Sequence, residues 1–535
     1  MGRTALIVGS GPAAAGAALA LLNEPDVTVT VIDIGGQLEP TNAAARARLG
    51  EQPASLWQPE DLALISRLPE QTEVAGVPEK RSYGSDFPFR DLGQLQGVDP
   101  EGSVNQAVVS SAFGGFSNVW GAQVMPFPSA AFRDWPFPAE ELHGHYSAVL
   151  GAIPYAAEAD DLQHQFPLLG KSFDLPKLSS RSAAVLGGYE RHRARLNSLG
   201  VTAGRARLAM SADQCIRCGL CMTGCPYRLI YSAADTWRKL VNDPRVSYRS
   251  GLLATQLREE EGAATVVARD VDTGEVTTFK ADRVFVGCGA IGSSRLVMGS
   301  LGLFGQEATV RESAQFVLPF FSQRAVPDPQ VEPHFTLNQF NVAVSLDAAG
   351  YDLAHLHFYT FDQSFKLALP RVLRRVRLSG VRSRVLRHLS VALGYVPSWA
   401  SPTFALRADA PAGPHELPRL RLSPPQSGDG GRERFMRSVV RRLVKAGRAL
   451  DCWPLLPVLS YAAPGKSYHF GGTFPHVTEP STRFASDPLG RVAPWTRIHL
   501  VDASVFPNVA ATTFTLTIMA NAHRIASELV QGRAW

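Results

Sequence analysis

The stretch that decides the fold is TALIVGSGPAAAGAALALL, residues 4–22, in which an apolar run, a glycine turn and a small-residue segment follow one another. This order predicts a strand, a tight turn in the G-x-G-x-x-G/A form, and a helix. Gly9 allows the chain to turn sharply, Gly11 allows the backbone to approach a pyrophosphate, and Ala14 allows the helix to pack close to the sheet. Because the helix start offers free N–H groups to phosphates, the stretch predicts a dinucleotide-binding unit.

The next apolar segment adds an acid where such a unit needs one. Val27–Ile32 predicts a second strand, and Asp33 follows it nineteen residues beyond Ala14. An acid at this place can accept a hydrogen bond from a ribose hydroxyl. Glycines also form ordinary turns, but strand, turn, helix, strand and acid in this order favour a cofactor site. Its predicted residues are Gly9, Gly11, Ala14 and Asp33.

The composition is that of a large globular protein. Of 535 residues, 45% are hydrophobic and 19% are charged, which excludes a disordered chain, and the length favours two intertwined domains. A net charge of +5 is modest for this length and gives no indication of nucleic-acid binding. No apolar run reaches the roughly 18 residues of a membrane span. Because the chain begins at a buried-type strand, without room for a secretory signal, we expect a cytoplasmic protein.

Four of the six cysteines lie in CIRCGLCMTGCP, residues 215–226. Their spacing, Cys-x2-Cys-x2-Cys-x3-Cys-Pro, is that of the bacterial ferredoxin run and predicts an iron–sulfur cluster. The predicted ligands are Cys215, Cys218, Cys221 and Cys225. With a single run, either Cys225 closes a [4Fe–4S] cluster locally or three cysteines hold a [3Fe–4S] cluster. A zinc site is one alternative, although zinc usually takes two separated Cys-x2-Cys pairs, and a structural or redox thiol group is another.

Later segments return the chain to the predicted cofactor domain. Residues 284–293 repeat a buried strand followed by a glycine turn, and residues 498–526 indicate a strand, Asp502, a polar loop and a long helix. Alternation over 318–361 predicts an antiparallel sheet with one face in water. We expect an α/β fold in which a Rossmann-like cofactor domain is intertwined with an α+β substrate domain. The expected limits are 1–125, 201–300 (with the cysteine loop 215–226) and 466–535 for the first, and 126–200 and 301–465 for the second.

Residues 365–389 form a basic stretch, with eight lysines and arginines and no acid. Leucines and valines between the cations predict two short helices broken at Gly380, each with an apolar and a cationic side. Such segments bind anionic membrane surfaces or acidic partners. Peripheral contact with the inner membrane is therefore one expectation, and a solvated basic face is the alternative.

Four blocks of the chain agree in order and spacing with one family. They are the Gly9 turn with Asp33, FGGFSNVWGA at 113–122, GCGAIGSSRLV at 287–297 and HFGGT…VDASVFP…TLTIMA within 469–520. These blocks resemble the glucose–methanol–choline oxidoreductases, flavoproteins that bind FAD, and they cover the cofactor half, whereas the substrate half matches only in position. The resemblance implies further FAD contacts at Gly115, Asn118, Trp120 and Asp502.

The same resemblance implies the catalytic residues. His469 fills the histidine of the H-x-x-G-T block, which takes the proton of the substrate hydroxyl as hydride leaves for the flavin; imidazole suits this role because it titrates near neutral pH. The family's second residue, His or Asn, falls at Thr513, whose hydroxyl can bind the substrate oxygen but cannot act as a base. We therefore expect catalysis by His469 with Thr513 in support, and His476 as the alternative base.

The cysteine run departs from most of the family and resembles the flavin sugar dehydrogenases that contain an iron–sulfur cluster. A flavin holds two electrons, whereas a cluster passes them singly, which suits an external electron acceptor. The expected function is FAD-dependent dehydrogenation of an alcohol, a sugar or polyol hydroxyl. The rivals are an oxygen-using alcohol oxidase without a functional cluster, and a non-catalytic flavin or cluster electron carrier.

Overall fold

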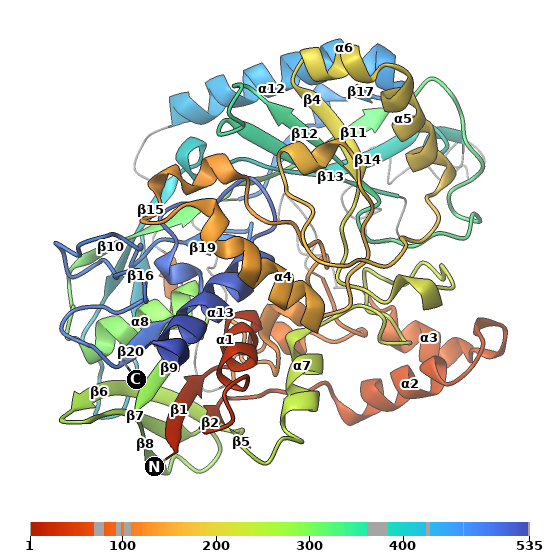
Figure 1. Cartoon of the computed structure of the whole chain (residues 1–535). Coiled ribbons are helices and arrows are strands. Elements are labelled where there is room, and N and C mark those ends of the chain that lie inside the picture. Colours follow the sequence, from red (N-terminus) through yellow and green to blue (C-terminus); the bar gives the residue numbers. More distant parts are fainter. Residues whose placement is uncertain are drawn as a thin grey trace.

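The computed structural model describes residues 2–68, 80–92, 98–100, 109–360, 384–423, 429–463, 465–532 and 535. A parallel sheet and a large antiparallel sheet lie at opposite ends of the molecule (Figure 1). Within these residues, no helix combines the length and the apolar character that crossing a membrane requires.

The parallel sheet contains the dinucleotide motif and has the strand order β20-β9-β1-β2-β5. Its strands are β1 (Arg3–Val8), β2 (Val27–Ile32), β5 (Val246–Arg249), β9 (Arg283–Val286) and β20 (Ile498–Leu500), all paired in parallel. Ala5–Val8 is fully buried, as expected for a strand covered on both faces. The strands predicted at 5–8, 27–32 and 284–286 are confirmed, and so is the α/β fold class.

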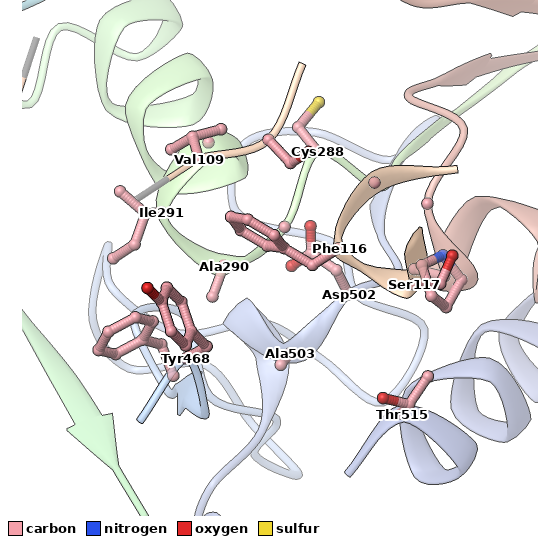
Figure 2. Close-up of a pocket in the computed structure, with 18 of the residues that line it drawn as sticks. Val109, Phe116, Ser117, Cys288, Ala290, Ile291, Tyr468, Asp502, Ala503 and Thr515 are labelled. Carbon is pink, nitrogen blue, oxygen red and sulfur yellow. The ribbon is translucent and has the colours of Figure 1, made fainter. Parts of the chain in front are cut away.

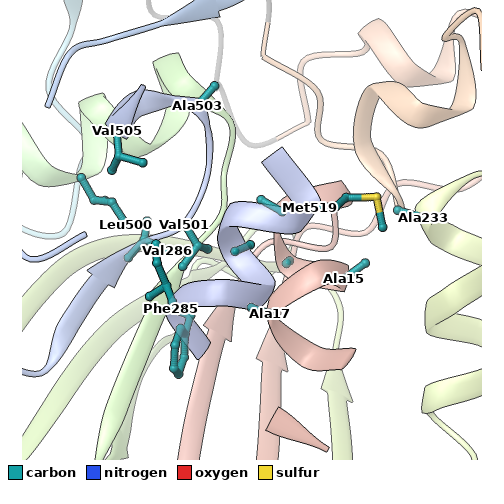
Figure 3. Packing of buried hydrophobic residues seen from close by; sticks show 14 of the residues in the cluster. Ala15, Ala17, Ala233, Phe285, Val286, Leu500, Val501, Ala503, Val505 and Met519 are labelled. Carbon is teal, nitrogen blue, oxygen red and sulfur yellow. The ribbon is translucent and has the colours of Figure 1, made fainter. Parts of the chain in front are cut away.

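The helix after the glycine turn, α1 (Pro12–Leu21), packs against the last helix, α13 (Thr515–Gln531). Figure 3 shows Ala15 and Ala17 of α1 beside Met519 of α13. Small side chains allow this approach, because a Cβ atom at Gly16 would overlap the backbone carbonyl of Met519. The contact brings the residues just before α13 to the glycine turn.

The large antiparallel sheet has the order β17-β11-β14-β13-β12-β4, with β18 also paired to β11. Its strands are β4 (Val201–Arg205), β11 (Gln315–Phe321), β12 (Phe340–Ser345), β13 (Leu353–Tyr359), β14 (Leu389–Tyr395), β17 (Trp453–Pro454) and β18 (Ser460–Tyr461). The long helix α12 (Asp429–Leu450) and α5 (Ser180–Arg191) cover one face of it. The antiparallel sheet predicted over 318–361 is confirmed.

The expectation that one face of this sheet lies in water is wrong. Every residue of β13 is buried. Leu356 and Phe358 pack in a core shared with Val439 and Leu443 of α12, whereas His357, on the other face, lines an internal cavity. The polar residues Asn341, His355 and His357, which suggested a wet face, are therefore all buried, and His357 lines a cavity inside the protein.

Two smaller sheets complete the architecture. One is antiparallel and contains β6 (Leu252–Glu260), β7 (Ala263–Asp270) and β8 (Val276–Ala281); the other has the order β19-β10-β15-β16-β3. The strands of the latter are β3 (Val98–Pro100), β10 (Glu307–Glu312), β15 (Thr403–Ala408), β16 (Leu420–Leu422) and β19 (Phe470–Gly471). Further helices are α2 (Pro40–Gly50), α3 (Pro59–Ile65), α4 (His143–Ala152), α6 (Arg193–Ser198), α7 (Ala233–Leu240) and α8 (Ala290–Ser300).

The domain limits inferred from the sequence stay a prediction. β4, in the segment 201–300 assigned to the cofactor domain, pairs with β12 of the large antiparallel sheet. Its Val201 and Ala203 are buried in the core shared with α12. Of the basic stretch 365–389, residues 365–383 lie outside the part of the chain that the structure describes.

Candidate active site

A cavity of about 370 Å³ lies between the glycine turn after β1 and the large antiparallel sheet. Its lining includes Gly9 and Gly11 of the dinucleotide motif, and also His469 and Thr513 of the last segment. Figure 2 shows the ring of Phe116 projecting into this space. Both predicted catalytic residues and most of the predicted cofactor residues thus share one space, although they come from distant parts of the chain; Ala14 and Asn118 do not line it.

The two glycines of the turn have different environments. Gly9 has a φ of 98°, and a Cβ there would lie 2.8 Å from the carbonyl oxygen of Gly287, so the turn itself requires glycine. A Cβ at Gly11 would meet nothing nearer than that same oxygen at 4.0 Å. The space over Gly11 is therefore open to a ligand, and the start of α1 faces it with unpaired N–H groups.

Asp33 lies at the end of β2 and lines the cavity. Its carboxylate accepts hydrogen bonds from the Ser10 hydroxyl and from the Tyr248 hydroxyl, the latter at 3.0 Å. Ser10 in turn accepts from the Gly114 N–H at 2.9 Å, which ties the second glycine block to the first. Burial raises the pKa of Asp33 to about 6, against the effect of these hydrogen bonds.

The block at 113–122 forms a turn beside the motif. Gly115 and Trp120 line the cavity, and a Cβ at Gly115 would lie 3.5 Å from the Cα of Gly11. Asn118 donates from its side chain to the carbonyls of Phe113 and Gly115 at 2.9 and 2.8 Å. The Asn118 amide therefore stabilises the turn that brings Gly115 to the glycine motif.

Asp502 also lines the cavity. It lies beside the first turn of α8, with which it forms a hydrogen bond. It is buried and accepts from the Ser293 hydroxyl and from the Ser504 N–H, the latter at 2.9 Å. Burial raises its pKa. Ala290, the first residue of α8, lines the same space, and Figure 2 shows it near Asp502. A second helix start therefore lies at this cavity.

His469 lies among aromatic rings. Its imidazole stacks on the Tyr395 ring at 4.7 Å between centroids, with 13° between the planes, and contacts the Phe514 ring at 4.6 Å. Burial lowers the pKa of His469 to about 3, so the imidazole is uncharged at neutral pH. Its Nδ1 atom has no hydrogen-bond partner among the described residues.

The loop that carries His469 is held by a buried acid. Glu312, at the end of β10, accepts from the N–H groups of Gly465 and Ser467 at 3.1–3.2 Å. The Ser313 N–H then donates to the carbonyl of His469 at 3.1 Å. These contacts fix the backbone that leads up to His469 and the carbonyl of His469 itself.

Three lining residues each leave a buried polar atom without a hydrogen-bond partner among the described residues: Gln123 Nε2, His469 Nδ1 and Thr513 Oγ1. Such an atom costs about 1–3 kcal/mol when nothing binds it. Protein interiors rarely tolerate several of them together. Their gathering in one cavity indicates a space built for a polar ligand.

His476, the alternative base, has a different environment. Its Nδ1 lies 2.7 Å from the carbonyl of Asp487 and 3.1 Å from the Ser486 hydroxyl, and its Nε2 lies 3.1 Å from the Asn521 amide. Both nitrogens are therefore used in contacts that connect the last loop to α13. This is the environment of a structural histidine.

Sequence reasoning missed the part of the lining that comes from the large antiparallel sheet. These residues are Gln315, His357, Tyr359, Leu393 and Tyr395. Alternation over 318–361 was the available signal, because it marks which residues share a face. It does not say which face is covered by a helix and which meets a cavity.

The four cysteines of the run 215–226 are free thiols in one loop. Burial, and to a lesser extent the three other thiols nearby, raises the pKa of Cys221 to about 12. Among the described residues, however, no three Cys, His, Asp or Glu side chains are placed to hold a metal ion. The structure therefore gathers the thiols without making them converge on one ion.

The cysteine loop lies against the cavity wall. The Thr336 N–H donates to Cys221 Sγ at 3.4 Å, and Met222 packs with Tyr359 and Leu393, which both line the cavity. A single layer of side chains therefore connects the loop to the cavity.

Solved structures share this fold over the whole chain. Pyridoxine 4-oxidase from Mesorbium loti has a TM-score of 0.61 at 16% identity, over 99% of this chain and 100% of its own. Two variants of formate oxidase from Aspergillus oryzae RIB40 have TM-scores of 0.59 and 0.61 at 13% identity, over 100% of both chains. At these identities the likeness establishes a common fold. No protein-family model and no curated protein sequence matches the chain.

Proposed function

We propose that this chain binds FAD and oxidises an alcohol of a small molecule, a sugar or polyol hydroxyl, as the glucose–methanol–choline oxidoreductases do. The observation on which this rests is that the dinucleotide turn and the pair His469 and Thr513 open onto one cavity. The fold shared with pyridoxine 4-oxidase and with formate oxidase, a protein in which FAD is modified, supports the same function.

The residues at the glycine turn fit FAD. The open space over Gly11 and the start of α1 suit a pyrophosphate, and Asp33 is placed for the ribose. A Cβ atom at Gly11 would begin to fill the space that the phosphates need. FAD, when bound, supplies the acceptor for the hydride of the substrate.

His469 supplies the base. Because its imidazole is uncharged, it can accept the hydroxyl proton of the substrate while the C–H bond breaks and the carbonyl forms. Removal of that proton is needed, since hydride departs only as negative charge develops on the oxygen. The Tyr395 and Phe514 rings keep the imidazole in one orientation.

Thr513 supplies a hydrogen bond. Its buried Oγ1 has no partner among the described residues, and the residue lies in the same cavity as His469. A hydroxyl there can hold the substrate oxygen toward the base, but it cannot take the proton. The division of roles expected from the sequence, one base and one hydrogen-bonding partner, is therefore kept in the proposal.

The experiment mixes the purified flavoprotein anaerobically with each member of a panel of alcohols and polyols. Reduction of the flavin is measured as the loss of its absorbance. We expect one subset of the panel to bleach the flavin. Gly11→Leu is the matched control: its side chain enters the open space, so the variant should fold but contain little FAD. Flavin that no member of the panel reduces would favour the electron-carrier alternative.

We propose further that Cys215, Cys218, Cys221 and Cys225 bind an iron–sulfur cluster that passes electrons to an external acceptor. Support comes from the ferredoxin spacing, from the loop's contact with the cavity wall, and from the N–H donors at the sulfurs. Backbone N–H groups reach all four thiols, as a buried cluster with thiolate ligands requires.

An alcohol oxidase is the second candidate. The observation in its favour is that solved structures with this fold are named oxidases. Hydrogen peroxide formed in step with substrate oxidation in air would support it. A dehydrogenase should instead turn over with an artificial one-electron acceptor and form little peroxide.

We also retain the proposal of a cytoplasmic enzyme that contacts the inner membrane through residues 365–389. The support is the charge of that stretch. Among the described residues, α12 carries exposed cations of its own, namely Arg434, Arg437, Arg441, Lys445 and Arg448. Both segments would favour an anionic surface.

A further inference from the structure

We propose that His357 binds a second hydroxyl of the substrate, so that the enzyme selects polyhydroxylated substrates over monoalcohols. This inference rests on the proposed alcohol oxidation and names the substrate class of that same site. It concerns a residue that neither the motifs nor the family resemblance identified.

His357 lies on the cavity face of β13. It is 1% exposed and lines the cavity, whereas its neighbours Leu356 and Phe358 pack in the core under α12. A histidine that only filled the core would be expected among the apolar side chains of that other face. His357 instead lies where a substrate would be held.

The position relative to His469 suits a second hydroxyl. The Tyr395 ring stacks on His469 at 4.7 Å and contacts the His357 ring at 5.0 Å. Both imidazoles therefore contact the same Tyr395 ring. A substrate whose reacting hydroxyl lies at His469 can therefore present a second hydroxyl, on a neighbouring carbon, to His357.

One ring nitrogen of His357 is held by a hydrogen bond within the protein, and the other ring nitrogen is available to a ligand. Nε2 lies 3.2 Å from His355 Nδ1, which in turn lies 3.0 Å from the Thr512 hydroxyl. No described residue is hydrogen-bonded to Nδ1 of His357. The contact with His355 therefore holds the ring, while Nδ1 is left for a ligand.

The chemistry around His357 is uncharged and polar. Burial lowers the pKa of His357 well below its ordinary value, so the ring offers a hydrogen bond without a charge. The hydroxyl of Tyr395 accepts from the Gln315 amide at 3.0 Å and keeps its own hydrogen to donate. Gln123, in the same lining, has a buried Nε2 without a partner among the described residues. These groups match the hydroxyls of a polyol.

Selectivity follows from the cost of leaving such groups unpaired. A monoalcohol would occupy the site beside His469 and leave Nδ1 of His357 without a hydrogen bond. A buried site that is built to bind a hydroxyl discriminates strongly against an analogue that lacks it. We expect the difference to appear in kcat/KM for the two substrate classes.

The test compares glycerol, a pentitol and a hexose with monoalcohols of matched chain length, by anaerobic flavin reduction and by steady-state kcat/KM. The wild type should prefer at least one polyol. His357→Leu should lower kcat/KM for that polyol by about 10–100-fold and leave the monoalcohol nearly unchanged. His357→Asn, which keeps a hydrogen-bonding group, should restore part of the preference, mainly through KM.

His388→Leu is the matched control, since His388 lies at the edge of β14 with its ring stacked on Phe321. It should leave the preference intact. A second measurement is the rise in thermal unfolding temperature that the polyol produces, which should shrink in His357→Leu and not in the control.

Two results would overturn the inference and leave alcohol oxidation standing: equal kcat/KM of the wild type for both classes, or an unaltered preference in His357→Leu. Flavin that no alcohol or polyol reduces would instead overturn the proposed function itself.

Discussion

His469 is expected to control the rate of flavin reduction without affecting FAD content. Replacing His469 by Ala removes the proton acceptor, so the reduction rate should fall by about 10²–10⁴. Thr513→Ala removes a single hydrogen bond and should cost about tenfold. Anaerobic stopped-flow absorbance measures both. A near-normal rate in the His469 variant would transfer the role of base to another residue.

The burial of His469 also predicts an unusual pH dependence. A base works in its neutral form, and burial lowers its pKa to about 3, so the neutral form persists to lower pH than in an ordinary histidine. The rate of flavin reduction should therefore be flat from pH 8 to about pH 5 and should fall only as the pH approaches the pKa. A rate that halves near pH 6.5 would show that the imidazole titrates as if exposed.

At the scale of elements, the contact of α1 with α13 makes a stability prediction. Gly16 faces the backbone of Met519 with no room for a Cβ, so Gly16→Ala should force the helices apart and cost about 1–3 kcal/mol. Gly144 in α4 has nothing within 4 Å, so Gly144→Ala should be neutral or stabilise by up to about 1 kcal/mol. Urea unfolding of both variants measures the difference, and equal midpoints would contradict the packing argument.

The contact of α13 with α1 also explains how two segments that are distant in the sequence form one site. α13 begins at Thr515, two residues after Thr513, and its contact with α1 brings this end of the chain beside the Gly9 turn. His469 arrives separately, on a loop held by Glu312 at the end of β10. The site therefore depends on two independent contacts between elements.

At the scale of the whole molecule, a variant in the cysteine run 215–226 tests how electrons leave the flavin. Anaerobically prepared wild type should contain iron and sulfide. Cys218→Ser should lose both and retain FAD, because the loop packs on Tyr359 and Leu393 of the antiparallel sheet through Met222. Substrate should still reduce that flavin, yet turnover with a one-electron acceptor should collapse.

The control for this prediction is Cys452→Ser, at a buried cysteine in the core under α12, which should leave the iron content unchanged. Zinc in the wild type, or no metal after anaerobic reconstitution with iron and sulfide, would contradict the cluster and favour the oxidase.

Membrane contact is also a property of the whole molecule. Each cation near an anionic surface contributes about 1 kcal/mol, so the eight in 365–389 should bind the protein to vesicles rich in anionic lipid at low salt and release it at high salt. Sedimentation measures this. Replacing Arg374, Arg375 and Arg377 by Gln should weaken binding more than the same change at Arg434, Arg437 and Arg441 of α12. Absence of binding at low salt would leave a solvated basic face.

The amino-acid sequence by itself determined the parallel sheet and its cofactor turn. The reason is that these signals are local: an apolar run forms β1, and the φ of 98° at Gly9 is open to glycine and to few other residues. The antiparallel sheet over 318–361 was predictable for the same reason, from alternation within each strand. The histidine of the candidate site was found through its short motif.

Only the tertiary structure decided which of these residues meet. Packing of α12 on one face of β13 turned His357 toward the cavity, and no pattern within the strand distinguishes a face covered by a helix from one that lines a pocket. Asp33 likewise acquired the hydroxyls of Ser10 and Tyr248 as partners from two other segments of the chain. Side chains far apart in sequence come together only through the contacts of the elements that carry them, and those contacts depend on the whole core.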